Sequence, residues 1–116
     1  MIGYNDEYDA YVIEFDDAVI CWNEEPEADC EQTAAEVREV YLRNIEAIAA
    51  VIYDEIKTIF QVSGVDEVIK KLGRPQIHPD DGQVTYCEHS FDDQHIISFE
   101  YLDDAFEDIQ YVAVDG

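Results

Sequence analysis

The chain has 116 residues, of which 47% are hydrophobic and 12% aromatic, and this predicts one folded domain over 1–116 rather than a disordered segment. It carries 29 acidic residues against 6 basic ones, a net charge of −23. Such a charge repels phosphates and anionic lipid headgroups, so it argues against direct binding to nucleic acid or to a membrane surface, and it attracts basic proteins.

The charge is unevenly distributed along the chain. All six basic residues lie between positions 38 and 74, where six acidic residues balance them. Residues 1–37 contain twelve acids and residues 75–116 contain eleven, and neither segment contains Lys or Arg. The net charge therefore comes entirely from the two flanking segments, which are the expected contact surface if the charge serves binding.

The cysteines and the N-terminus indicate the compartment. Cys21, Cys30 and Cys87 are odd in number and lack the Cys-x-x-Cys spacing, which is typical of reduced thiols. The first residues are polar and acidic, unlike a signal or transit sequence, and no apolar run approaches the length of a membrane span. We therefore expect a cytoplasmic protein without a membrane segment.

The first predicted element is a β-hairpin. Residues 8–15 alternate between apolar and polar side chains as a half-buried strand does, and 18–22 would return beside them. Asp16 and Asp17 would form the turn, because Asp hydrogen-bonds the nearby backbone. An acidic loop over 23–30 then leads to the helical region.

The strongest pattern in the sequence is a helix over 33–62, a stretch without Gly or Pro. Thr33 and Glu36 have the spacing of a capping box at its start. Because thirty residues would span about 45 Å, too long for a domain of this size, we expect the helix to end or distort near 58–62. Its apolar stripe repeats every eleven residues, which predicts a nearly straight helix lying on a sheet: Ala34, Val37, Tyr41, Ile45, Ile48, Ile52, Ile56 and Ile59.

The apolar arc of this helix covers roughly 220° of its circumference, more than one sheet face can cover. A short second helix is predicted over 65–72, with acids in its first turn, lysines in its last turn and Gly73 as its stop. We favour this short helix over a partner chain as the cover for the remaining flank.

The C-terminal part of the chain predicts a β-meander with strands over 76–78, 83–90, 95–102 and 106–114, separated by acidic turns. The element order is then ββ-α-α-βββ, with a possible fourth C-terminal strand. This order predicts an α+β fold, in which an antiparallel sheet of about five or six strands has one long helix packed across one face.

Four Asp-Asp pairs fall at predicted turns, at 16–17, 80–81, 92–93 and 103–104. Turn formation is the favoured interpretation, ahead of calcium or magnesium binding and of catalysis by paired carboxylates. The spacing of an EF-hand calcium loop is absent. The eight tyrosines fit a protein interface and half-buried strand positions equally well.

The other residues capable of chemistry are His78, Cys87, His89 and His95. Cys87 and His89 would share one face of a strand and His95 could face them, so zinc binding or a thiol–imidazole pair is a weaker alternative. The close ligand spacing of zinc sites is missing, and no catalytic motif is present. We therefore predict no metal, no cofactor and no enzymatic activity.

Two stretches, YVIEFDDAVICW over 11–22 and FDDQHIISFEYLDDAFEDIQYVAVDG over 91–116, flank the helical region. With a hairpin, a long helix and a C-terminal meander in this order, the chain resembles small acidic bacterial α+β proteins of immunity type, some of which sit beside secreted toxins. The resemblance is one of pattern and carries no functional residue across. It implies an inhibitor of a cognate toxin.

The leading hypothesis is a protein-interaction module that neutralises a basic partner, an immunity protein acting as a monomer or homodimer on a toxin domain such as a nuclease. The alternatives are a nucleic-acid mimic that inhibits a DNA-binding protein, a metal protein or enzyme using the meander histidines, and a soluble α+β domain whose acidity reflects a high-salt environment. The predicted partner-binding residues lie in the acidic turns and loops: Asp16, Asp17, Glu24, Glu25, Asp92, Asp93, Asp103, Asp104, Glu107 and Asp108.

Overall fold

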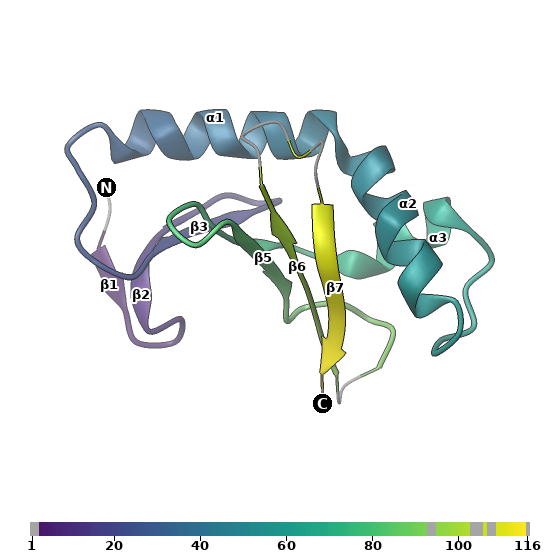
Figure 1. The fold of residues 1–116 in the computed structure, drawn as a ribbon. Helices are drawn as coiled ribbons and strands as arrows, with labels where there is room; N and C mark the ends of the chain where they lie inside the picture. Colours follow the sequence, from purple (N-terminus) through teal and green to yellow (C-terminus); the bar gives the residue numbers. More distant parts are fainter. Residues whose placement is uncertain (1–2, 93–94, 103–105, 107–108, 116) are drawn as a thin grey trace.

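A computed structural model describes residues 3–92, 95–102, 106 and 109–115 (Figure 1). Seven strands form one sheet, and their order in space is their order in the chain. The strands are β1 (Gly3–Asn5), β2 (Ala10–Glu14), β3 (Val19–Trp22), β4 (Gln76–His78), β5 (Gln83–Tyr86), β6 (Ile96–Tyr101) and β7 (Ile109–Asp115). The predicted α+β class is confirmed, although the predicted five or six strands are too few.

The sheet is mixed, because β3 and β4 run parallel, with Val19 opposite Gln76 and Ile20 opposite Ile77. The other neighbouring strands in the described sheet pair antiparallel. A parallel pair cannot be joined by a tight turn and needs a long crossover, which here is the whole helical segment. The prediction of a purely antiparallel sheet is therefore wrong at its centre.

The helical segment forms three helices, α1 (Cys30–Arg43), α2 (Ile45–Ile56) and α3 (Val65–Leu72). The predicted single straight helix is wrong, because the chain bends at Asn44 and α2 leaves the direction of α1 (Figure 1). Asn44 has φ −108° and ψ 11°, and its side-chain amide donates a 2.9 Å hydrogen bond to the carbonyl of Val40. This bond satisfies a carbonyl that the break in the helix would otherwise leave without a partner.

The predicted helix ends need two further corrections. The first helix begins at Cys30, three residues before the predicted capping box, and Asp29 in the N-cap position makes no side-chain capping bond. The second ends at Ile56, just before the stretch where we expected an end or a distortion. The short helix α3 matches its prediction and ends before Gly73, which has a positive φ of 72°.

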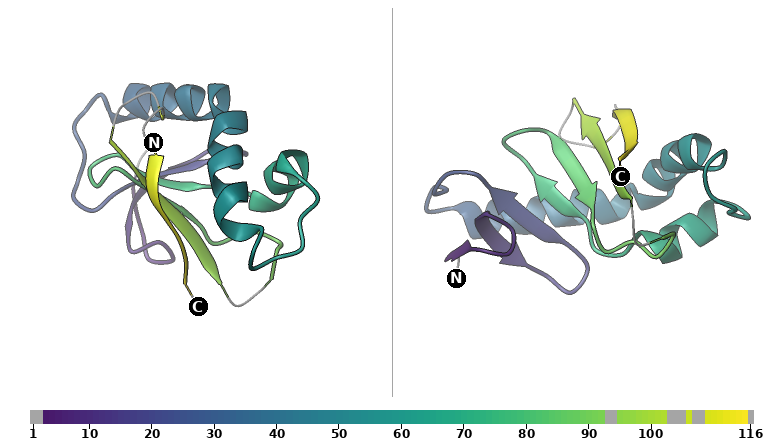
Figure 2. Two further views of the ribbon diagram at one scale, coloured as in Figure 1. Left: turned by 45° about the vertical axis from the view of Figure 1, so that its right-hand side comes forward. Right: turned by 90° about the horizontal axis from the view of Figure 1, so that it is seen from below.

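The bend places the helices on different parts of the sheet. The first helix contacts β3, whereas α2 contacts β7 and α3, and two further views show α2 and α3 side by side (Figure 2). The remaining apolar flank of α2 is thus covered by the short helix, as favoured from the sequence. The main core lies between helices and sheet, and its largest fully buried side chains include Tyr41, Tyr86, Phe99, Ile20, Ile48, Ile52, Ile56, Leu72 and Ile77.

A second, smaller apolar cluster lies on the other face of the sheet. It consists of Ala10, Val12, Val19 and Cys21, with Tyr8 packed against it. Successive residues of a strand point to opposite faces, so β3 contributes Ile20 and Trp22 to the main core and its other two residues to this cluster. All four residues of β3 are buried, as expected of a strand that is covered on both faces.

Candidate interaction surface

The basic side chains are largely engaged within the chain. Among the described residues, five of the six form ion pairs with acids, and three of these pairs join neighbouring turns of one helix: Arg43–Glu39, Lys57–Asp54 and Lys71–Glu67. The other two bases, Arg38 and Arg74, connect segments that are distant in the sequence. The bases are thus largely paired with acids of the chain itself, and most of the described acidic side chains are exposed.

Arg38 joins the β2–β3 hairpin to α1. Its Nε and a terminal nitrogen donate hydrogen bonds of 2.6 and 2.8 Å to the two carboxylate oxygens of Asp17, and the guanidinium lies 5.1 Å from the ring centre of Phe15. Hydrogen bonding to Arg38 lowers the pKa of Asp17 below its usual value of 3.8. Of the two acids predicted at this turn, Asp17 is occupied within the fold and Asp16 is exposed.

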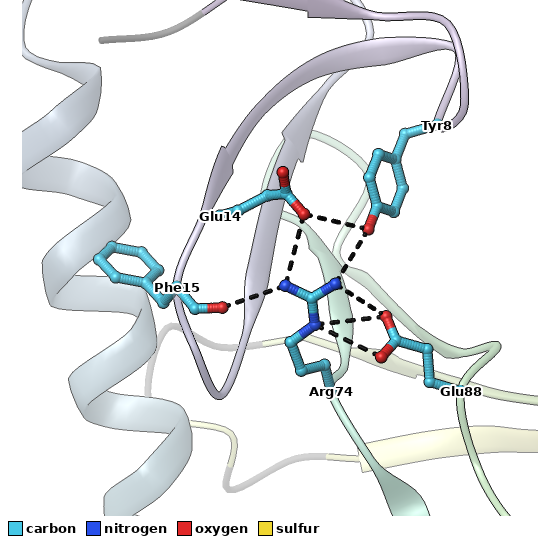
Figure 3. Close-up of polar contacts among 5 residues, drawn as sticks. All are labelled: Tyr8, Glu14, Phe15, Arg74 and Glu88. Atoms are coloured by element: carbon cyan, nitrogen blue, oxygen red, sulfur yellow. Dashed lines mark hydrogen bonds and ion pairs between the residues drawn. The ribbon is translucent and has the colours of Figure 1, made fainter.

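Arg74 connects four segments at the other face of the sheet (Figure 3). It donates to the carboxylate of Glu88 at 3.1–3.4 Å, to Glu14 at 3.4 Å, to the carbonyl of Phe15 at 3.2 Å and to the hydroxyl of Tyr8 at 3.3 Å. The pKa of Arg74 is raised, chiefly by its hydrogen bonds to Glu88. The contacts hold Tyr8 against the smaller apolar cluster.

Acidic loops gather at one edge of the sheet. Because β3 and β4 are parallel, the loops that follow them leave the sheet at the same edge. The side-chain amide of Asn23, after β3, donates a 3.0 Å hydrogen bond to Asp81, after β4. The two loops line a groove of about 220 Å³ whose acidic residues are all exposed: Glu24, Glu25, Glu27, Asp29 and Asp80.

We call this groove and its five acids the acidic groove. Of its acids, Glu24 and Glu25 were predicted as partner-binding residues, and the structure places them together. The predicted residues did not include Glu27 and Asp29 of the same loop, nor Asp80, which was interpreted only as part of a turn. The signal that would have found it is the parallel pairing of β3 and β4, and short-range sequence patterns do not reveal that pairing.

A second groove, of about 320 Å³, lies beside the acidic groove. It is lined by Thr33, Glu36, Val37, Val40, Pro79, Tyr101 and Phe106, and Thr33 is shared with the acidic groove. Phe106 is buried, and the centre of its ring lies 4.4 Å from that of Tyr101 and 5.7 Å from that of Tyr41. We call this second feature the apolar groove, since five of its seven lining residues are apolar or aromatic.

The residues considered for zinc are used differently. His89 shares a 2.6 Å hydrogen bond with the carbonyl of His95, and its other ring nitrogen accepts a 3.3 Å bond from the amide of Phe91. The ring of His95 is hydrogen-bonded to Asp92. The predicted strand over 83–90 ends at Tyr86, so the expected shared strand face of Cys87 and His89 does not form.

Within the described parts of the chain, no group of three His, Cys, Asp or Glu side chains is placed to hold a metal ion. Much of the Cys87 residue is exposed, but the surrounding protein partly removes water from its thiol. This desolvation raises the pKa of Cys87 and disfavours the thiolate form. Asp92, predicted as a partner-binding residue, accepts a 3.0 Å hydrogen bond from the amide of His95. The remaining predicted acids lie outside the described residues: Asp93, Asp103, Asp104, Glu107 and Asp108.

Comparisons of the chain with protein-family models, with curated proteins and with solved structures found no match. None of the helices in the described part of the chain has the length and hydrophobicity needed to cross a membrane.

Proposed function

We propose that the protein is an acidic interaction module that binds and neutralises a basic partner, as an immunity protein neutralises a toxin domain such as a nuclease. One observation carries the proposal. In the described part of the chain, five of the six bases form ion pairs with acids of the same chain, whereas five exposed acids from two loops line the acidic groove. Part of the surplus negative charge is thereby gathered at one edge of the sheet.

This arrangement supports fast binding of a basic protein. Charges of one sign gathered at a hollow surface steer an oppositely charged partner toward it and raise its association rate. The cost of gathering them is mutual repulsion among the acids, which a basic partner relieves on binding. The groove is small, so it fits individual Lys or Arg side chains of a partner rather than a whole small-molecule substrate.

The alternative of a nucleic-acid mimic is supported less well. A mimic needs carboxylates in rows that resemble the phosphates of a duplex. Exposed acids here also occur on the hairpin turn, on α2 and on β6, at Asp16, Glu46 and Glu100. Acids spread over several elements are expected of a protein that combines one binding edge with a generally acidic surface.

The proposal is tested by identifying a partner and measuring its association. The full chain, immobilised at low salt, should retain a basic protein from a lysate of the cells in which the chain is naturally produced. Coexpression of the chain should relieve the growth inhibition caused by that protein. The association rate of the purified pair should fall at least about tenfold between about 50 and about 500 mM salt. Retention of no basic protein, or an affinity independent of salt, would contradict the proposal.

Two charge-matched variants locate the contact. The triple substitution Glu24→Gln, Glu25→Gln and Glu27→Gln removes three charges from the acidic groove. The control substitution Glu46→Gln, Glu55→Gln and Glu100→Gln removes three exposed charges elsewhere. We expect the first variant to slow association several-fold more than the second, because charges near the contact dominate steering. Equal effects would place the contact away from the groove.

A further inference from the structure

We propose that the partner segment bound at this edge carries an apolar side chain beside its basic residues, with the apolar side chain in the apolar groove and the basic residues on the acidic groove. This inference rests on the proposed function and specifies the chemistry of the partner. It concerns a short protein segment, in which one apolar anchor residue and a cluster of Lys or Arg residues are separated by a fixed distance.

The apolar groove has the form of an anchor site. Val37 and Val40 on α1 and Pro79 after β4 are half-buried in the groove, and the two valines also pack against the main core. Phe106 is only 2% exposed and ties the groove to Tyr41 in the main core. The volume of about 320 Å³ is at the lower end of the range for binding pockets, which suits one or two apolar side chains. Apolar anchors in such pockets commonly dominate the affinity of an interface.

The position of Thr33 sets the spacing between the two parts of the site. Thr33 borders both grooves, whereas Val40, seven residues later on the same helix, borders only the apolar one. Seven residues of α-helix span about 10 Å. An extended peptide advances about 3.3 Å per residue, so its basic residues should begin about three positions from the apolar anchor.

Charge identifies the occupant as a basic partner rather than a second copy of this chain. A second copy seated here would bring its own share of a net charge of −23 against the acidic groove. Like charges in contact are strongly unfavourable, whereas Lys or Arg residues next to the anchor are attracted. A purely apolar peptide would leave the neighbouring carboxylates without a counter-charge.

The inference is tested with three synthetic peptides and the full chain. The first has a phenylalanine three positions before three consecutive lysines; the second has serine in place of phenylalanine; the third has the phenylalanine nine positions away. Calorimetry should give an affinity for the first peptide at least about tenfold higher than for the second, which corresponds to burial of one large apolar side chain. The third should resemble the second.

Protein variants localise the anchor. Val40→Glu places a charge in the apolar groove and should reduce the affinity for the first peptide about tenfold. Ala47→Glu adds the same charge at an exposed position of α2 and should change the affinity less than about twofold. Val37→Ala, which adds no charge to the groove, guards against a folding defect in the first variant. The methyl resonances of Val37 and Val40 should shift with the first peptide alone.

The outcomes distinguish a failure of the apolar anchor from a failure of the acidic site. If the first two peptides bind equally, with affinities that fall with salt and with the Glu24, Glu25 and Glu27 substitutions, the apolar anchor is wrong and the acidic site stands. If no peptide binds in a salt-dependent way, both proposals are overturned. If the first peptide binds more tightly but Val37 and Val40 do not shift, the anchor lies elsewhere and the inference is overturned.

Discussion

Arg38 holds both carboxylate oxygens of Asp17, at 2.6 and 2.8 Å, and this pair fastens the β2–β3 hairpin to α1. A bidentate pair of this kind is stronger and more directional than a single contact between a lysine and a carboxylate. The side chain of Arg38 is 37% exposed and that of Asp17 is 39% exposed, so solvent screens much of the attraction. The pair therefore fixes the position of the hairpin more than it determines the overall stability.

Asp17→Asn should lower the free energy of unfolding by about 0.5 to 1 kcal/mol at neutral pH. The contribution has a defined pH dependence, because the folded-state pKa of Asp17 is lower than its usual value of 3.8. It is fully present above the unfolded-state pKa and is lost as the pH falls through the lower folded-state pKa. Denaturant unfolding between neutral pH and about pH 2 measures this difference.

Asp16→Asn is the matched control. It removes the same charge at the neighbouring residue, whose side chain is exposed. It should leave the stability unchanged or raise it slightly by reducing repulsion. If Asp16→Asn and Asp17→Asn have equal effects at every pH, the pair with Arg38 does not stabilise the fold.

Arg74→Met should destabilise the protein by about 1 to 3 kcal/mol, because the substitution leaves Glu14 and Glu88 close together without their shared cation. Part of the loss should be recovered in high salt, which screens repulsion between the two carboxylates. Thermal unfolding at several salt concentrations measures both effects.

Arg43→Met provides the comparison for Arg74. Its partner Glu39 is 72% exposed and lies on the same helix, so the loss should not exceed about 0.5 kcal/mol and should depend little on salt. Similar losses for the two substitutions would mean that Arg74 acts only as a surface charge.

Tyr41 and Tyr86 share a buried hydrogen bond of 2.6 Å between their hydroxyl groups. Tyr86→Phe should cost about 1 to 3 kcal/mol, because it removes the partner of a hydroxyl that water cannot reach. Adding Tyr41→Phe to this variant should cost less than Tyr41→Phe alone, since no unpaired hydroxyl then remains. A double-mutant cycle by urea unfolding measures the coupling, and strictly additive losses would contradict it.

Gly73→Ala should destabilise the protein by about 2 kcal/mol. Gly73 has φ 72° and ψ −161°, a conformation open almost only to glycine, and a Cβ there would lie 2.8 Å from the carbonyl oxygen of Glu88. Gly64→Ala is the control, because Gly64 has an extended backbone with open space around it. The control should be neutral or slightly stabilising, and thermal unfolding of both variants separates the two expectations.

The sequence predicted those elements whose signals are local. The helix α3 combines a helical charge pattern with a glycine stop, and β2 and β6 alternate in burial much as strands should. The bend at Asn44 was missed because the eleven-residue stripe continues across it without a change of phase. Tyr41 and Ile48 are buried on either side of the break, so hydrophobic periodicity carries no sign of the change in direction.

Features that depend on distant contacts were beyond local patterns. The first helix starts at Cys30, since burial of this side chain in the main core outweighs the capping signal at Thr33. The parallel pairing of β3 with β4 joins segments separated by three helices, and the sequence of neither strand indicates which strand will lie beside it. Asp80 reaches the acidic groove only through this pairing, which is why it was not among the predicted binding residues.

The parallel pair also determines how the chain must fold. The N-terminal hairpin and the C-terminal meander consist of contacts between near neighbours in sequence, whereas β3 meets β4 only after a loop containing every helix has closed. Closing a long loop costs entropy before its contacts form, so this step is expected to limit the folding rate. Trp22, the only tryptophan, lies at the end of β3 and is buried in the main core, so its fluorescence should follow that closure directly. In stopped-flow refolding, Ile77→Val in β4 should slow the fluorescence change, whereas Ile52→Val in α2 should act mainly on unfolding.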